Sequence, residues 1–308
     1  MRKNTFKRCL FLLLLLTAHC AVWAGKNVVF TTPEEYQLFR ISPNGQWACG
    51  MYVDYSNNTY GFRWNLVSGN IELLSTNEQS EAWSISDNGV VAGACTVKLD
   101  GQVSRSLPAL YYDDEWHVLE LPTSSVAQGI AYDITPDGQY VVASLSYGGS
   151  GPYEAYIWKD GKIHRQLSDM GGGCPMPYCI SPDGQTAGGW KTNYNRQACL
   201  WNADGTVTVL SDKESPWSCA RRFSPDGKKV LMWGGWDDEG LLALYDIETG
   251  EKTWVAPIDE EGSFELFDID SHTTLVGENG GRGFVWQEGK GGQYLDAYLE
   301  EQGVDLKE

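Results

Sequence analysis

Short hydrophobic segments alternate with turns rich in glycine, proline and acidic residues along most of the chain. The clearest turn reads Ile-Ser-Pro-Asp-Gly or a close variant, and successive copies start 43 to 49 residues apart. Proline presets the backbone at its position, and glycine takes a positive φ without a clash, so each copy predicts a hairpin. Six copies are recognisable, the last of them worn, and they begin at Ile41, Ile85, Ile134, Ile180, Phe223 and Ile269.

Each turn belongs to a repeat of four strand-like segments. One segment precedes the turn, a segment of small and β-branched residues such as 140–144 follows it, a third ends in an aromatic residue as at 156–158, and an outer segment such as 206–210 closes the repeat. A four-stranded sheet cannot bury both faces alone, so the repeats are expected to stack around an axis. The pattern predicts an all-β, six-bladed β-propeller of four-stranded blades. A seven-bladed propeller with one incomplete or missing blade is the alternative.

The segment before each turn carries a large side chain two residues ahead of the turn isoleucine or phenylalanine. Alternate residues share one face of a strand, so these side chains are expected to pack in the layer between blades. They are Phe39, Trp83, Tyr132, Tyr178, Arg221 and Phe267. The residues that follow them are expected to point the other way, and they are Arg40, Ser84, Asp133, Cys179, Arg222 and Asp268.

The first 24 residues have the order of a signal peptide. Four basic residues precede an apolar run at 10–16 that is too short to cross a bilayer, and Val22 and Ala24 suit a signal peptidase. A lipid anchor at Cys20 is the less favoured alternative, because His19 stands where a small residue is expected. We therefore expect an exported protein, in the periplasm or at the cell surface, with one propeller domain over 25–308 and a short helix at about 295–302.

The turns and the aromatic-ended segments resemble two groups of bacterial repeat proteins. One is the exported family with HAF-type repeats, and the other is the TolB-like propeller family, whose Ser-Pro-Asp-Gly turn resembles 224–227. The resemblance covers nearly all of residues 25–308 and implies a propeller. It implies binding or unassigned roles and no shared catalytic set, because a fold does not define a function. In HAF-type chains a helix like 295–302 precedes another blade.

Charge and cysteine content limit the kinds of partner, metal and cofactor that we expect. Residues 25–308 contain 19 basic and 41 acidic residues, a net charge of −22, which repels nucleic acid; no segment there is apolar enough to span a membrane. Cys174 and Cys179 are the one close cysteine pair, a candidate disulfide or half of a metal site. A second ligand pair with metal-site spacing is missing, so no metal is expected. The histidines after residue 24 stand in no catalytic motif, and no cofactor is expected.

A ligand site is expected at one mouth of the channel, formed by residues just before the turns and by the loops that end the outer strands. Arg221 and Arg222 stand out, because a guanidinium pair suits a carboxylate or an acidic sugar, although surface salt bridges would also account for them. The candidate ligand-binding residues are Arg40, Trp83, Tyr178, Trp217, Arg221 and Arg222.

The leading functional hypothesis is an exported, non-catalytic binding or scaffold propeller that recognises a protein, a peptide or a glycan. Loops from every blade converge at a channel mouth, while the sheets behind them stay rigid. One alternative is a hydrolase or lyase that acts on polysaccharide through carboxylates of different blades. The other is a structural extracellular repeat protein.

Overall fold

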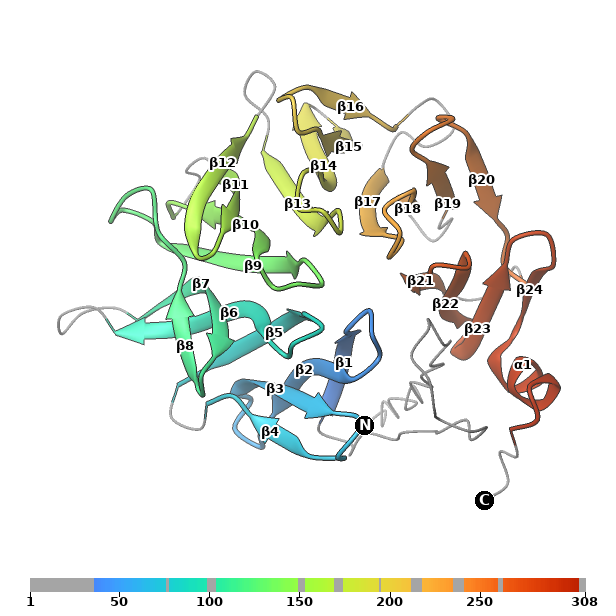
Figure 1. Cartoon of the computed structure of the whole chain (residues 1–308), viewed down its shortest axis with the longest axis horizontal. Helices are drawn as coiled ribbons and strands as arrows, with labels where there is room; N and C mark the ends of the chain where they lie inside the picture. The colour runs from blue at the N-terminus through green and yellow to red at the C-terminus, as the bar shows by residue number, and fades with distance from the viewer. Residues whose placement is uncertain are drawn as a thin grey trace, which may run out of the picture.

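The computed structural model describes residues 36–75, 78–98, 104–148, 153–168, 174–193, 195–211, 218–234, 241–259 and 263–304. In these residues 24 strands form six antiparallel sheets of four consecutive strands each. The sheets are arranged around one axis, and the first strand of every sheet lies nearest the centre (Figure 1). The predicted six-bladed propeller of four-stranded blades is therefore confirmed, and the seven-bladed alternative is not.

The blades follow one another in chain order. Blades 1 to 3 consist of β1 (Tyr36–Ile41), β2 (Trp47–Val53), β3 (Thr59–Asn65), β4 (Ile71–Leu73); β5 (Ser80–Ile85), β6 (Val91–Lys98), β7 (Ser104–Tyr112), β8 (Glu115–Val118); β9 (Gln128–Ile134), β10 (Tyr140–Ser146), β11 (Tyr153–Lys159) and β12 (Lys162–Leu167). Blades 4 to 6 consist of β13 (Pro175–Ile180), β14 (Ala187–Asn193), β15 (Asn195–Trp201), β16 (Val207–Val209); β17 (Ser218–Phe223), β18 (Lys229–Gly234), β19 (Leu241–Asp246), β20 (Lys252–Val255); β21 (Phe264–Ile269), β22 (Thr274–Asn279), β23 (Arg282–Gln287) and β24 (Gly291–Tyr294).

The repeated turn joins the first and second strands of each blade. Its glycine has a positive φ in five blades, as at Gly184 with φ 72°. The acidic residue before the glycine accepts hydrogen bonds within the turn: the amide of Gln185 donates to Asp183 Oδ1 at 3.0 Å. In the worn copy of blade 6, Thr273 takes the positive φ, 61°, in place of glycine. The turns thus have the hairpin geometry that the sequence predicts.

Apolar side chains fill the layers between neighbouring blades. One cluster joins Leu110 of blade 2 to Val141 and Trp158 of blade 3, and comparable clusters join the later blades. The aromatic residue that ends the third strand is buried, and Trp158 also donates its indole N–H to the carbonyl of Glu120 at 2.8 Å. Stacking of the blades therefore supplies the core that one sheet alone cannot form.

A short helix, α1 (Leu295–Glu301), packs against β23 and β24 through buried Tyr298 and Leu299. It lies where the sequence predicts a helix. Among the described residues, no helix is long and apolar enough to cross a membrane.

Candidate functional site

Every innermost strand contains a β-bulge at the same position. In β1 the pairing with β2 passes from Leu38 to Arg40, so Phe39 has no partner across the ladder. The same shift occurs in β5, β9, β13, β17 and β21. A bulged residue leaves the regular alternation, and its side chain is re-aimed. The six bulged residues are Phe39, Trp83, Tyr132, Tyr178, Arg221 and Phe267.

Five of the bulged side chains form a continuous arc along the inner edge of the ring, which we call the aromatic collar (Phe39, Trp83, Tyr132, Tyr178 and Arg221). Phe39 and Trp83 stack with ring centroids 5.2 Å apart, and Trp83 meets Tyr132 edge-on at 5.8 Å. Tyr132 lies 5.0 Å from Tyr178, whose ring lies 5.1 Å from the guanidinium of Arg221. The rings therefore pack on one another between neighbouring blades, as the sequence predicts, but at bulged positions that the expectation of regular alternation missed.

The collar side chains of Trp83 and Arg221 point toward the end of the channel at which the innermost strands begin, which we call the strand-start mouth. The indole N–H of Trp83 donates to Glu81 Oε2 at 2.8 Å, two residues nearer the start of β5. Burial raises the pKa of Tyr132 to about 12, against a hydrogen bond with Ser144 that lowers it. Arg221 lies 5.7 Å from the ring of Trp233, near the end of β18 that meets the start of β17.

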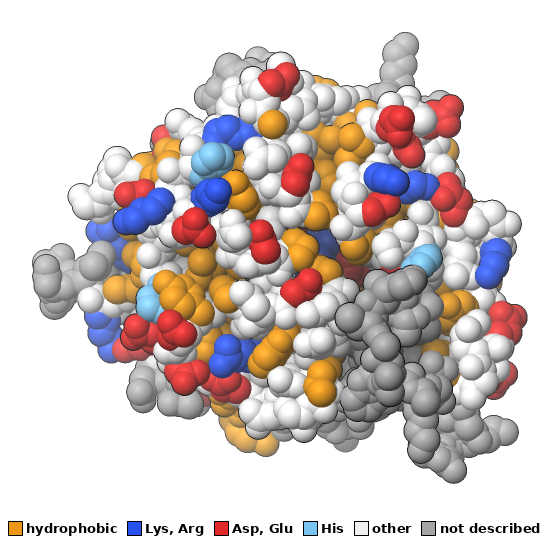
Figure 2. Space-filling view, viewed as in Figure 1, with side chains coloured by type: hydrophobic (Ala, Val, Ile, Leu, Met, Phe, Trp, Pro, Cys, Tyr) orange, Lys and Arg blue, Asp and Glu red, His pale blue; other side chains and the backbone are white. Residues whose placement is uncertain are grey.

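Directly below the collar, charged side chains from several blades meet, and we call this layer the floor (Arg40, Ser84, Asp133, Arg222 and Asp268). Arg40 Nη2 lies 2.6 Å from Asp133 Oδ1, and Arg40 Nη1 lies 3.7 Å from Asp268 Oδ1. The hydroxyl of Ser84 donates to Asp133 Oδ1 at 2.7 Å. Figure 2 shows the middle of the ring hollowed, with basic and acidic side chains recessed among hydrophobic ones. Arg40 thus links blades 1, 3 and 6 across the channel.

Arg222 is the second cation of the floor, and it has no such partner. Its Nη1 donates to the carbonyl of Arg221 at 3.0 Å, while its buried Nε has no hydrogen-bond partner. Burial, with the positive charge of Arg40, lowers the pKa of Arg222 to about 10, although Asp268 and Asp133 raise it. The Nε of Arg40 is also without a partner, so what distinguishes Arg222 is that it forms no ion pair with the described residues.

The thiols near the floor are neutral. Cys49 and Cys179 are buried, and burial raises the pKa of Cys49 to about 12 and that of Cys179 well above its ordinary value. Cys174 and Cys179 are free thiols. Cys174 directly precedes β13 and Cys179 lies within it. Five residues of extended strand separate their Cα atoms by roughly 16 Å, whereas a disulfide needs less than about 7 Å. The candidate disulfide is not formed.

The structure brings five of the six candidate ligand residues together: Trp83, Tyr178 and Arg221 in the collar, and Arg40 and Arg222 in the floor. Trp217 lies outside the described residues. The expected mouth needs a correction, because the antiparallel order of each blade puts the repeated turns and the loops after the outer strands at opposite ends of the channel. Asp133 and Asp268 are not among the candidate ligand residues predicted from the sequence, and their contacts with Arg40 cross between blades.

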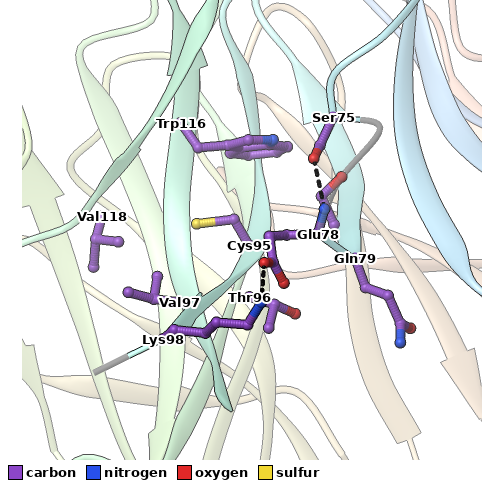
Figure 3. Close-up of a pocket in the computed structure, with 10 residues that line it drawn as sticks. Ser75, Glu78, Gln79, Cys95, Thr96, Val97, Lys98, Trp116 and Val118 are labelled. Atoms are coloured by element: carbon purple, nitrogen blue, oxygen red, sulfur yellow. Dashed lines mark hydrogen bonds and ion pairs between the residues drawn. The ribbon is translucent and has the colours of Figure 1, made fainter. Parts of the chain in front are cut away.

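A second depression, of about 420 Å³, lies on the side of blade 2 (Figure 3). The ring of Trp116 lies over Cys95, and Lys98 forms an ion pair with Glu78 at 2.6 Å. Because that pair neutralises itself and burial raises the pKa of Cys95 to about 11, the depression offers no charged or nucleophilic group to a ligand. In the described part of the chain, no group of three or more His, Cys, Asp or Glu side chains is placed to hold a metal ion.

No protein-family model matches this chain, and no curated protein sequence matches it. The β-propeller domain of the Trilobed protease from Pyrococcus furiosus is 14% identical with a TM-score of 0.57, over 89% of this chain and 85% of that one. Putative TolB from Agrobacterium tumefaciens is 14% identical with a TM-score of 0.51, over 81% and 88% of the two chains. TolB from Acinetobacter baumannii is 18% identical with a TM-score of 0.45 over 69% of this chain, which spans 52% of that protein. Similarity to TolB-like propellers at such identities shows the fold alone, and nothing in it bears on the HAF-type repeats.

Proposed function

We propose that this chain is an exported, non-catalytic binding propeller whose strand-start mouth takes an extended peptide segment of a partner protein. The observation that carries the proposal is the bulge repeated in all six innermost strands. Each bulge carries a large side chain, and five of the six are aromatic. The side chains from blades 1 to 5 form the collar. Six equivalent departures from regular pairing at one level support a site there, because bulges are over-represented next to functional sites and re-aim side chains.

The walls of the channel favour a peptide over a glycan. Each innermost strand pairs on one side only, so its free edge presents N–H and C=O groups that an extended peptide complements. A sugar stacks best on an open ring face, whereas Phe39 and Trp83 cover each other at an interplanar angle of 5°. Ring edges and strand edges together suit the alternating side chains of a peptide.

The floor favours binding over catalysis. Asp133 accepts hydrogen bonds from Arg40, from Ser84 and from the amide of Ile180, so both of its carboxylate oxygens are occupied by protein donors. A general acid or base needs a group that exchanges its proton readily, and the neighbouring thiols are held neutral by burial. These contacts support a binding role for the floor, which would hold a ligand in place without reacting with it.

Export rests on the sequence of residues 1–24 and is part of the proposal. Expression of the full chain in a Gram-negative host, followed by intact-mass measurement of the periplasmic fraction, is expected to give a protein that begins at Gly25. A protein that keeps residues 1–24 and stays with the cytoplasmic fraction would contradict export. A mass increase from lipid at Cys20 would support the alternative anchor.

Retention of peptides on the immobilised protein tests the binding function. A randomised hexapeptide pool is expected to be retained by the parent, and Trp83→Ala should reduce retention at least about tenfold, since a central aromatic contact contributes roughly 1.4 kcal/mol or more. Trp254→Ala on the outer strand β20 is the matched control, because its ring is 38% exposed and far from the collar in the order of strands. Equal retention by all three proteins would refute the site.

A further inference from the structure

The eight arginines after residue 24 divide into two groups. Five donate to a carboxylate or to a backbone carbonyl of another segment: Arg40, Arg63, Arg105, Arg165 and Arg282. The remaining three, Arg196, Arg221 and Arg222, form no ion pair within the residues that the structure describes. In a chain with a net charge of −22 after residue 24, three arginines without a carboxylate partner need an explanation.

These three arginines gather at one place, where blades 4 and 5 meet. Arg221 and Arg222 are adjacent in β17 of blade 5, and Arg196 lies in β15 of blade 4, a strand that contacts β17. Burial raises the pKa of the nearby thiol of Cys219 to about 12, and Arg221, Arg196 and Arg222 each lower it. Cys219 is the second residue of β17, so the cluster lies beside the strand-start mouth. Arg222 belongs to the floor and has a buried, unpartnered Nε.

Aromatic rings hold two of the guanidinium groups by their faces. Arg221 lies 5.1 Å from the ring of Tyr178 and 5.7 Å from that of Trp233, and Arg196 lies 4.7 Å from the ring of Trp190. A guanidinium that stacks on a ring keeps its N–H donors in its own plane, and these donors suit the two oxygens of a carboxylate. The guanidinium groups of Arg196 and Arg221 are thus oriented for an anion, and Arg222 uses one donor on the carbonyl of Arg221.

We propose that Arg196, Arg221 and Arg222 form a carboxylate subsite, which takes the C-terminal carboxylate or an acidic side chain of the bound peptide. The inference rests on the proposed peptide-binding function and adds the chemistry of the ligand. The net negative charge of the protein disfavours polyanions such as nucleic acid as ligands of this subsite, because the protein repels them far more strongly than it repels a single carboxylate.

Two forms of one randomised hexapeptide pool test the proposal, one ending in a free carboxylate and the other in a carboxamide. The parent is expected to retain the carboxylate form at least about tenfold better, which corresponds to the 1.4 kcal/mol of one charge-assisted contact. Arg221→Gln and Arg196→Gln should remove this preference while still retaining the carboxamide form. Arg282→Gln is the control, since that side chain is 53% exposed and pairs with Asp296 on the outer part of blade 6.

The outcomes separate the subsite from the binding function. Equal retention of both forms by the parent would overturn the carboxylate subsite and leave peptide binding intact. Retention of neither form would overturn both. If Arg282→Gln also loses the preference for the carboxylate form, the preference is a general effect of protein charge, and the subsite is overturned. An oligogalacturonate retained better than either pool, and lost in Arg221→Gln, would keep the arginines as a carboxylate site but overturn the peptide as its ligand.

Discussion

Arg40 and Arg222 occupy the same position in two blades, yet their surroundings are opposite. Arg40 has Asp133 at 2.6 Å and Asp268 at 3.7 Å, whereas Arg222 has one hydrogen bond, to the carbonyl of its neighbour Arg221. Removing a buried charge that has partners destabilises the folded protein, because the partners are left buried and uncompensated. A buried charge without partners itself destabilises the folded state. The two arginines should therefore respond differently to the same substitution.

Arg40→Met should lower the free energy of unfolding by about 3 to 5 kcal/mol, because it leaves the buried carboxylate of Asp133 uncompensated. Arg222→Met should raise it by about 1 kcal/mol, because it removes a charge whose pKa burial has already lowered to about 10. Urea unfolding monitored by tryptophan fluorescence measures both. A loss of stability in Arg222→Met as large as that in Arg40→Met would mean that Arg222 has a partner.

Burial raises the pKa of Cys49 and of Cys219 to about 12, from an ordinary 9.0. The folded state therefore keeps these thiols protonated, and the stability that this contributes is present below pH 9 and is lost as the pH rises from 9 toward 12. At pH 8, iodoacetamide should modify the half-buried Cys174 and spare the five buried cysteines, as measured by peptide mass spectrometry. A Cys174–Cys179 disulfide in the oxidised, folded protein would contradict the structure.

At this scale the sequence points to the arginines but not to their partners. Arg221 and Arg222 stand out from composition, since positive charge is scarce in this chain. The ion pair between Arg40 and Asp133 joins residues 93 positions apart, and only the closure of the ring brings them together. No local pattern signals such a contact.

Among the elements, the innermost strand departs most from its sequence pattern. Period-two alternation places Phe39 and its equivalents between the blades, but a bulge in each strand inserts one residue and breaks the alternation. An aromatic residue at the same position in five of six repeats was the available signal. This recurrence indicates that the position has the same environment in each blade, but it does not show in which direction the side chain points. The turns and the aromatic-ended strands, which depend on local backbone preferences, could be predicted.

Gly184→Val should destabilise the protein by about 1 to 3 kcal/mol, because φ is 72° there. A Cβ at this position would also meet Tyr140 Cγ at 2.3 Å, so the loss should reach the upper part of that range. Gly205→Val is the control for backbone strain alone, since its φ is +83° and a Cβ there meets nothing within 4 Å. Equal losses for the two variants, measured by thermal unfolding, would show that the Tyr140 contact relaxes without cost.

Thr273→Gly should stabilise the protein, in contrast to Gly184→Val. Thr273 is β-branched at φ 61°, and the other five blades use glycine at the equivalent place. Removing the strain should raise the free energy of unfolding by about 1 to 3 kcal/mol. The greater conformational freedom of glycine in the unfolded chain should lower it by about 0.4 to 1 kcal/mol. A rise in Tm is therefore expected. A fall in Tm would mean that the threonine side chain stabilises the turn of blade 6.

At the scale of the whole molecule, hydrogen bonds between the repeated turns connect blades 1, 2 and 3. The amide of Asn44 in blade 1 donates to Asp87 Oδ1 in blade 2 at 2.8 Å, and the amide of Asp87 donates to the carbonyl of Pro136 in blade 3 at 2.8 Å. The number of repeats and strands could be predicted from spacing, because each repeat is a local unit that stacks on its neighbours. Which mouth carries the proposed site could not be predicted, since that depends on the direction in which the collar side chains point.

The net charge of −22 after residue 24 predicts an unusual salt dependence. Screening the repulsion between the protein and a peptide carboxylate should raise the association rate constant several-fold between about 10 mM and 150 mM salt, as the Debye length falls from about 30 Å to about 8 Å. Stopped-flow fluorescence with a retained hexapeptide acid measures this rate. An association rate that falls with salt would show that the local arginine cluster, and not the whole molecule, governs approach.

Photocrosslinking from the collar tests most directly whether the channel holds the ligand. Phe39 replaced by p-benzoylphenylalanine should capture retained hexapeptides on irradiation, because its ring lies on the inner edge of blade 1 beside Trp83. The same replacement at Trp254, on outer strand β20, should capture none above background. Capture at position 254 with none at position 39 would place the peptide on the outside of the ring and contradict binding at the strand-start mouth.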